Sequence, residues 1–431
     1  MRISAAAGPS VSLRRIIVAC CIGSTIEWFD FFAYAIAAAL VFPALFFPSL
    51  SPLSGSLAAF ATLGVGFLAR PVGGMLMGHY GDRLGRKSML VLSLLGMGIA
   101  TVGIGVLPTY AQIGVLAPIL LVLLRCVQGL AIGGEWGGAV LIAVEHAPAN
   151  RRGLYGSFVQ MGIPAGVILS NLVILLVSTG LTGEQFRSWG WRIPFLLSLV
   201  LVIVGFVVRA GVTESPLFRQ AVATSQVSRA PVVEVLRTAR RQVLLAAGTF
   251  IAPNAMGYMV TTYSLSYATT FLHVPRATMI TMILSAAVVW LAAAGCFAAL
   301  SDSLGRRRVL VASLIGLVLW SLVFFPLLQT GSTPLMYLAL AVLAGLCGAA
   351  NGPQAALFSE MFRTNVRYSG ISLSYQIGSI LGGGIAPFLA TALYALTMTS
   401  VPITVYLVLM SALSLCCALL VVEASRHKLS G

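Results

Sequence analysis

Two acidic residues three positions apart, Glu27 and Asp30, lie inside a long apolar stretch of the sequence. Residues at this spacing share one face of a helix, and three aromatic residues, Trp28, Phe29 and Phe31, surround them. Burial and a like-charged neighbour both favour the protonated form of a carboxyl group. We therefore expect this pair to take up and release a proton, with Asp30 as the leading proton carrier and Glu27 as a second choice.

Arg125, Glu135 and Arg70 are further ionisable residues within apolar stretches. Arg125 stays charged, so we expect its guanidinium to pair with Asp30 or to present a two-pronged donor to a substrate carboxylate. The alternative is a static Asp30–Arg125 ion pair that only fixes two helices. Glu135 is a further candidate proton carrier. Arg70 either extends toward the polar boundary, pairs with Glu135 or binds substrate.

Neutral polar residues dominate the corresponding stretches in the second half of the chain. Asn254, Tyr258 and Thr261 stand at i, i+4 and i+7, which places them on one helix face. Such a face would bind hydroxyl or carboxyl groups in a central cavity, although it could equally serve to link neighbouring helices. The expected substrate-binding set is Arg125, Tyr34, Gln128, Asn254, Tyr258, Gln354 and Gln376.

Membrane-spanning helices must position these residues, because 59% of the chain is apolar and only 9% is charged, against roughly 45–50% and about 25% in soluble domains. Runs of about 20 apolar residues, enough to cross a bilayer, recur along the whole chain. They do not alternate as barrel strands would. The expected spans are 16–42, 54–78, 88–107, 114–144, 153–180, 191–212, 243–270, 277–300, 309–329, 334–360, 368–395 and 401–422.

The placement of the basic residues predicts the sidedness of these spans. Of the 26 lysines and arginines, 21 fall on one side, and only Arg187, Arg192 and Arg276 fall on the other. Positive residues stay cytoplasmic, so both termini are expected in the cytoplasm. The net charge of +15 is thus explained without nucleic acid. The seven cysteines fall in apolar spans as packing residues, and we expect no metal or cofactor.

An internal repeat divides the chain into two related halves. The loop at 78–87 contains Asp82, and a similar loop contains Asp302, 220 residues later. This offset pairs the first six spans with the last six, as in one known transporter layout. We expect an all-α membrane protein with two six-helix pseudo-symmetric bundles, at 1–212 and 243–431, joined by a cytoplasmic linker at 213–242.

The two repeated loops combine a carboxylate with arginines where helices leave the membrane. Such a carboxylate can cap a helix start, where the helix dipole favours negative charge, or pair with an arginine from a neighbouring helix. We expect a cytoplasmic latch that breaks and re-forms as the halves rock, although a plain positive loop is the alternative. Its residues would be Asp82, Arg83, Arg86, Asp302 and Arg306.

The loop at 78–87 resembles the signature of the major facilitator superfamily, and Arg125-x-x-Gln128-Gly129 resembles its second motif. More narrowly, the chain resembles the metabolite–proton symporters, with shikimate-transporter-like members as the nearest subgroup. The matching segments are 27–31, 66–74, 133–138, 189–195, 214–216 and 367–370. In shikimate carriers an acidic residue is expected near Asn254, and this chain lacks it, so the resemblance leaves the substrate open.

This resemblance implies proton-coupled import of a small polar, anionic metabolite by alternating access, carried out by a monomer in the inner membrane. A proton-driven efflux antiporter of the same fold is the alternative. Its glycine–proline motif on the fifth span is matched only in part, by Gly153, Gly162, Pro164 and Gly166. A membrane sensor would usually carry an added soluble domain. An enzyme is not expected, because no nucleophile–base set or phosphate loop is apparent.

Overall fold

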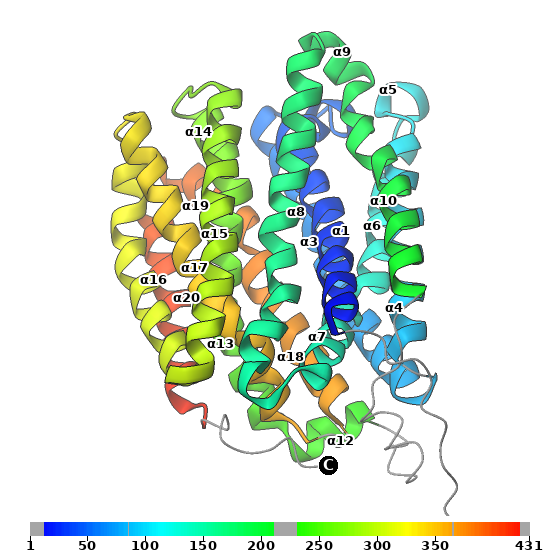
Figure 1. Ribbon diagram of the computed structural model, residues 1–431. Helices are drawn as coiled ribbons and strands as arrows, with labels where there is room; N and C mark the ends of the chain where they lie inside the picture. The colour runs from blue at the N-terminus through cyan, green and yellow to red at the C-terminus, as the bar shows by residue number, and fades with distance from the viewer. Residues whose placement is uncertain (1–12, 85, 211–230, 364–365, 423–431) are drawn as a thin grey trace, which may run out of the picture.

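The computed structural model of the chain describes residues 13–84, 86–210, 231–363 and 366–422, without the side chains of 81–84, 86, 209–210 and 231. Within these residues, twelve helices are long and apolar enough to cross a membrane. They stand side by side and run between two opposite faces of the molecule (Figure 1). The twelve expected spans are therefore confirmed, with ends that shift by up to about four residues, as is usual for boundaries judged from sequence.

The first six spans form the N-half, which here means the helices from α1 to α10. Its helices are α1 (Leu13–Leu40), α2 (Phe42–Phe46), α3 (Pro52–Leu84), α4 (Arg86–Val106), α5 (Tyr110–Ile113), α6 (Leu116–Ile132), α7 (Glu135–His146), α8 (Arg152–Gly180), α9 (Gly183–Ser188) and α10 (Ile193–Ala210). Two short 3-10 turns, η1 (Ala149–Arg151) and η2 (Gly190–Arg192), precede α8 and α10.

The last six spans form the C-half, which here means the helices from α13 to α20, with α12 (Pro231–Thr238) before them. Its helices are α13 (Arg240–Tyr258), α14 (Ser264–Thr270), α15 (Arg276–Leu304), α16 (Arg306–Leu328), α17 (Thr333–Met361), α18 (Arg367–Ser379), α19 (Ala386–Thr397) and α20 (Val401–Leu420). Two π-helical turns, η3 (Met259–Tyr263) and η5 (Ile380–Gly384), interrupt the seventh and eleventh spans.

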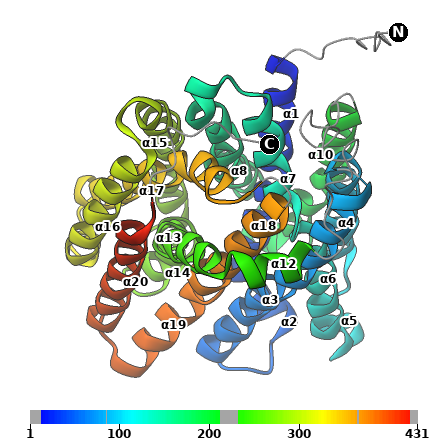
Figure 2. The same cartoon turned by 90° about the horizontal axis from the view of Figure 1, so that it is seen from below.

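The two halves stand next to each other and meet along two seams. Seen from below, α8 lies beside α15 on one side, and α3 lies beside α18 and α19 on the other (Figure 2). The face that carries α12 and η1 is called the α12 face. The opposite face, which carries α5 and α9, is called the α9 face (Figure 1).

The fourth span is not a single helix. It ends as α6 at Ile132 and restarts as α7 at Glu135, with Gly133 and Gly134 between the two parts. The tenth span, by contrast, is one helix, because α17 continues through Pro353 from Thr333 to Met361. A proline within a spanning helix is tolerated where neighbours satisfy the freed backbone groups.

Close packing of α3 on α6 brings the two central arginines onto touching helices. A Cβ atom added at Gly129 would lie 2.2 Å from the Gly66 carbonyl oxygen, and one at Gly133 would lie 2.3 Å from the Arg70 carbonyl oxygen. A Cβ at Gly66 would lie 3.2 Å from the Arg125 guanidinium. Glycine is therefore needed for both the helix contact and the space that Arg125 occupies.

We expect Gly129→Ala to destabilise the protein by about 1–3 kcal/mol, because the new methyl group overlaps the α3 backbone. The thermal midpoint of the purified protein in detergent, followed by size-exclusion chromatography, should fall by several degrees. Gly180→Ala is the matched control, since nothing lies within 4 Å of its added Cβ. Equal midpoints for the two variants would contradict the packing described here.

Candidate functional site

Aromatic rings from both halves meet near the middle of the molecule. Phe31 of α1 lies 5.1 Å from Phe67 of α3 and 5.7 Å from Tyr258 of α13, measured between ring centroids. Phe67 and Tyr258 are 5.8 Å apart, and the three pairs meet edge to face, which is a favoured geometry for rings. All three side chains are buried. They form one apolar contact across the two halves.

Arg70 lies against this aromatic cluster. Its guanidinium carbon is 4.4 Å from the Phe67 ring centroid and 4.8 Å from that of Phe31, and its residue is 1% exposed. Ring faces attract a cation at these distances. Of the alternatives left open for Arg70, extension toward the polar boundary does not fit this burial. Its buried Nη1 atom has no hydrogen-bond partner.

Arg125 lies near the same Phe31 ring. Its guanidinium carbon is 3.8 Å from the Tyr34 ring centroid and 5.1 Å from that of Phe31. Its Nη1 donates to the Gln128 side-chain oxygen, whereas its buried Nε and Nη2 atoms have no partner. Tyr34 is fixed beneath it by a hydroxyl contact with Thr62.

Arg70 and Arg125 thus place two cations near one phenylalanine ring, and Arg70 Nη1 and Arg125 Nε and Nη2 have no hydrogen-bond partner. A buried donor without an acceptor costs about 1–3 kcal/mol. A carboxylate has acceptor oxygens that match a guanidinium fork. The arrangement is therefore suited to holding a small anion, with the aromatic rings enclosing its apolar part.

Asp30 is completely buried and is held by hydroxyl groups. Thr101 of α4 donates to one carboxylate oxygen at 3.1 Å, and Ser198 of α10 donates to the other. The expected direct pair with Arg125 is not formed. Instead, Gln128 donates to the Thr101 hydroxyl at 2.8 Å and accepts from Arg125. A hydrogen-bonded chain therefore joins the Arg125 guanidinium to the Asp30 carboxylate.

The other two candidate proton carriers lie on different elements of the N-half. Glu135 is the first residue of α7, directly after the break in the fourth span, and accepts from the Ser93 hydroxyl at 2.9 Å. Glu27 lies one turn before Asp30 on α1 and is 2% exposed. All three carboxyl groups are thus enclosed in the N-half, and the chain through Thr101 links Asp30 to Arg125.

The neutral residues expected to bind substrate take different places. Tyr258 reaches the aromatic cluster, and its buried hydroxyl has no partner. Asn254 donates to the Ser379 carbonyl at 3.3 Å, so in this structure it links two spans of the C-half. Gln354 donates to the Thr249 carbonyl at 3.1 Å and Gln376 donates to the Gly133 carbonyl at 2.6 Å, while each keeps an unpaired side-chain oxygen.

Polar contacts bind the two halves together toward the α12 face. Asp302 of α15 accepts from the Gly153 and Leu154 backbone N–H groups at 2.8 and 3.0 Å, at the start of α8. The Arg306 Nη2 atom lies 3.2 Å from Asp302 Oδ1 and 3.1 Å from Glu360 Oε1. The Asp302 carboxylate therefore caps the start of α8 in the other half, where the helix dipole favours a negative charge.

Further contacts across the halves surround the break in the fourth span. The Tyr368 hydroxyl donates to the Gly134 carbonyl at 2.7 Å, next to the Gln376 bond to Gly133. Arg367 lies 3.6 Å from Glu145 in an ion pair that we did not predict. These bonds hold the two halves together near the α12 face. The side chains of Asp82, Arg83 and Arg86, which were also expected there, lie outside the described residues.

The α9 face instead contains a pocket of about 580 Å³ between the halves. Its walls come from α2 and the start of α3 in the N-half, and from α14 and α19 in the C-half. Ser51, Ser266 and Thr391 supply polar groups among mostly apolar lining residues. A pocket of this size can admit a small metabolite.

Thr101, Ser198 and Ser93 were missed by sequence reasoning, although each binds a buried carboxylate. A single hydroxyl residue in an apolar span most often bonds to its own helix, so it gives no distinct signal. Among the described residues, no group of three or more histidine, cysteine or acidic side chains could hold a metal ion.

Comparisons with known proteins agree with this architecture. A family model described as Major Facilitator Superfamily matches residues 20–376 and 254–430. The structure is similar to the xylose transporter XylE from E. coli, with a TM-score of 0.75, 16% identity, and coverage of 96% of this chain and 99% of that one. At this identity the similarity concerns the fold.

Closer relatives are similar over nearly the whole sequence. The chain is 42% identical to the inner membrane metabolite transport protein YhjE of Escherichia coli, covering 97% of this chain and 96% of the relative. It is 44% identical to the shikimate transporter of the same species, covering 88% and 87%. It is 34% identical to the proline/betaine transporter of Salmonella typhimurium, covering 97% and 85%. The chain is therefore not an enzyme but a multi-pass membrane transporter that belongs to the major facilitator superfamily, among its metabolite transporters.

Proposed function

We propose that this protein is a proton-coupled symporter that imports a small anionic metabolite, such as an organic acid or a shikimate-like acid, across the inner membrane. The observation that carries this proposal is the pair of guanidiniums of Arg70 and Arg125, which keep buried N–H groups without a partner. Arg125 is in addition joined to the buried Asp30 by a hydrogen-bonded chain. Relatives named as an inner membrane metabolite transport protein and a shikimate transporter support it.

The substrate would bind between the arginines and the C-half. Its carboxylate would accept hydrogen bonds from Arg125 and Arg70, and its ring or chain would lie against Phe31 and Phe67. Tyr258 of the C-half lies within 6 Å of both rings, and its hydroxyl is unpaired. A ligand held in this way contacts both halves, which is what alternating access around a central site requires.

Proton coupling follows from charge balance at this buried site. With Asp30 ionised, its negative charge offsets that of Arg125 through Gln128 and Thr101. Protonation of Asp30 removes that offset, so the site becomes more cationic and favours an entering anion. Because uncompensated charge is costly inside a membrane, the proton and the anion bind better together than either binds alone. Such linkage is the basis of symport.

The α12 face would be the cytoplasmic gate. Most of the basic residues fall on this side by sequence, in agreement with the positive-inside rule. Asp302 would cap α8 while the gate is closed and would release it when the halves rock apart. The chain would work as a monomer, because both halves of the site come from one polypeptide.

The substrate class is tested by uptake into proteoliposomes with and without an imposed proton gradient. Radiolabelled organic acids, shikimate-like acids and betaines form the panel. We expect at least one carboxylic acid to accumulate with the proton gradient, while betaines, which carry a fixed cation, accumulate less because of the two arginines. No gradient-dependent uptake of any compound would exclude a symporter, and movement against the proton flow would indicate the antiporter.

Replacing Asp30 by Asn should abolish accumulation driven by the proton gradient but retain exchange of labelled for unlabelled substrate. Asn cannot carry the proton, but its side-chain oxygen can still accept from one of the two hydroxyl groups, Thr101 or Ser198, and its NH2 group can donate to the other hydroxyl oxygen. Uptake and counterflow are measured in parallel for Asp30→Asn, Glu27→Gln and Glu135→Gln. Equal loss of both activities in Asp30→Asn would favour a purely structural role for Asp30. Selective loss in another variant would reassign the proton carrier.

Replacing Asp302 by Asn should lower the transport rate about tenfold or more, because the variant loses the charged cap of α8 and the Arg306 ion pair. Substrate affinity, measured by equilibrium binding, should change little. Ser303→Ala is the matched control, since the Ser303 hydroxyl is exposed and bonds only its own helix. A rate for Asp302→Asn equal to that of this control would rule out the gating role.

A further inference from the structure

A second, much smaller pocket lies on the α9 face at the opposite seam, between α8 and α15. Its free volume is about 10 Å³, roughly the room of one water molecule. Nine of its ten lining residues belong to the N-half, on α1, α8, α9, η2 and α10 or next to them. Arg276 is the one residue that the C-half contributes.

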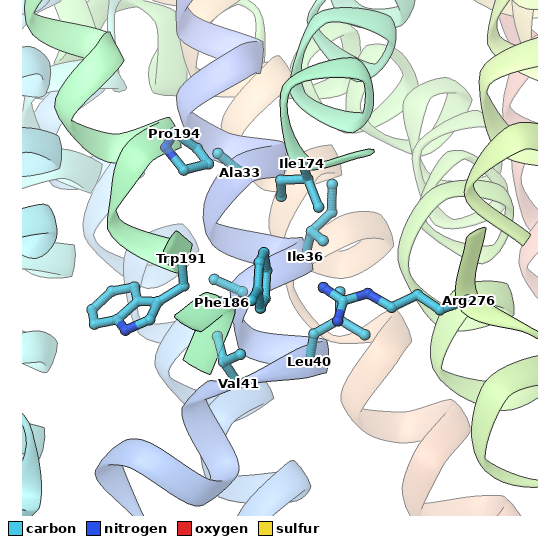
Figure 3. Close-up of a pocket in the computed structure, with 10 residues that line it drawn as sticks. Ala33, Ile36, Leu40, Val41, Ile174, Phe186, Trp191, Pro194 and Arg276 are labelled. Atoms are coloured by element: carbon cyan, nitrogen blue, oxygen red, sulfur yellow. The ribbon is translucent and has the colours of Figure 1, made fainter. Parts of the chain in front are cut away.

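The Arg276 side chain forms one wall of this pocket. Arg276 is the first residue of α15, and it extends away from that helix toward Phe186 and Leu40 (Figure 3). Its guanidinium carbon lies 4.6 Å from the Phe186 ring centroid. The C-half therefore inserts a cation into an apolar recess of the N-half.

The positive charge of Arg276 is only partly compensated in this recess. The buried Nε and Nη2 atoms of Arg276 have no hydrogen-bond partner. Glu184 lies on the same short helix as Phe186, but it is exposed, and no described contact joins it to Arg276. The Phe186 ring attracts the cation, yet it accepts far less than a carboxylate would. Water would satisfy these donors if the side chain withdrew.

The two seams of the α9 face therefore differ. On the α3–α19 side the halves leave the pocket of about 580 Å³, and on the α8–α15 side Arg276 bridges them. Separation of the halves at this face must pull Arg276 out of its recess. Its unpaired N–H groups would then gain water, which lowers the cost of opening.

We propose that Arg276 is the closing residue of the α9 face, held by Phe186 rather than by an ion pair so that the closed state is easily released. This role rests on the proposed alternating access. It assigns a gating function to a residue outside the central site and outside the latch around Asp302.

The test measures access to the recess rather than transport. Ala37, which is 5% exposed and lines the pocket, is replaced by cysteine, and its labelling by a membrane-impermeant maleimide is followed from the α9 face. Labelling of the parent protein is subtracted. Ser54→Cys, at an exposed position of the same face, checks that the reagent reaches this side. Absence of maleimide labelling at Ser54→Cys would contradict the proposed placement of the α9 face on the outer side of the membrane, and not the gating role of Arg276.

We expect Arg276→Gln and Phe186→Leu each to speed labelling of Ala37→Cys about fivefold. Loss of the Arg276–Phe186 contact should raise the population of the open state by about this factor. Arg276→Lys should fall between, because a lysine keeps the charge without the planar face. Arg187→Gln is the matched control: it removes a neighbouring exposed charge that does not line the pocket.

Unchanged labelling in both Arg276→Gln and Phe186→Leu would overturn the proposal. An equal increase in Arg187→Gln would also overturn it, because the effect would then reflect the surface field alone. The thermal midpoint of each variant is measured alongside, and a gate residue should alter labelling while leaving this midpoint within a few degrees. Faster labelling that only accompanies a large fall in the midpoint would indicate a structural role and reject the gate.

Discussion

A guanidinium inside a membrane must find its hydrogen-bond acceptors within the protein, because hydrocarbon offers none. Arg70 and Arg125 meet this constraint only in part. Aromatic faces cover their planes, and Gln128 accepts one N–H group, but other donors remain unpaired. The contacts around Arg70 and Arg125 are arranged to hold these partly unpaired guanidiniums. Glycines let α3 and α6 approach closely enough to hold both side chains, and Asp30 supplies the compensating charge through two intermediate side chains.

The two halves contribute unequally to this arrangement. The carboxylates and arginines buried in the middle of the spans belong to the N-half, whereas the C-half brings Tyr258 and neutral amides. Apart from Arg276 on the α9 face, the charged groups of the C-half that reach the N-half lie at the α12 face, among them Asp302 and Arg367. At the middle of the spans, the charged groups of the N-half therefore face uncharged polar groups of the C-half. Two π-helical turns lie beside Tyr258 and Asn254 in the C-half, and such turns are frequent at functional sites.

Hydropathy was sufficient for the spans, because runs of about 20 apolar residues have few other uses. The repeat drew attention to Asp302, which does contact the other half. Helix periodicity could not say which neighbours Arg70 meets, since one face of a spanning helix offers both aromatic rings and carboxylates. For the same reason it suggested a direct Asp30–Arg125 pair where Gln128 and Thr101 intervene. Which side chains of two spans meet depends on how each helix is rotated about its axis and how deep each residue lies in the membrane. Local sequence patterns do not determine these two quantities.

The cap at the start of α8 has an evolutionary consequence. The N-half partners of Asp302 are the backbone amides of residues 153 and 154, and any amino acid except proline provides such an amide. Exchanging a side chain there removes no bonding group. Position 153 tolerates little beyond glycine, because a Cβ would lie 2.8 Å from both the Ala298 carbonyl oxygen and the Asp302 carboxylate. We therefore expect two positions at this junction to be constrained: the carboxylate of Asp302 and the glycine at 153. The residues around them can change without loss of these hydrogen bonds.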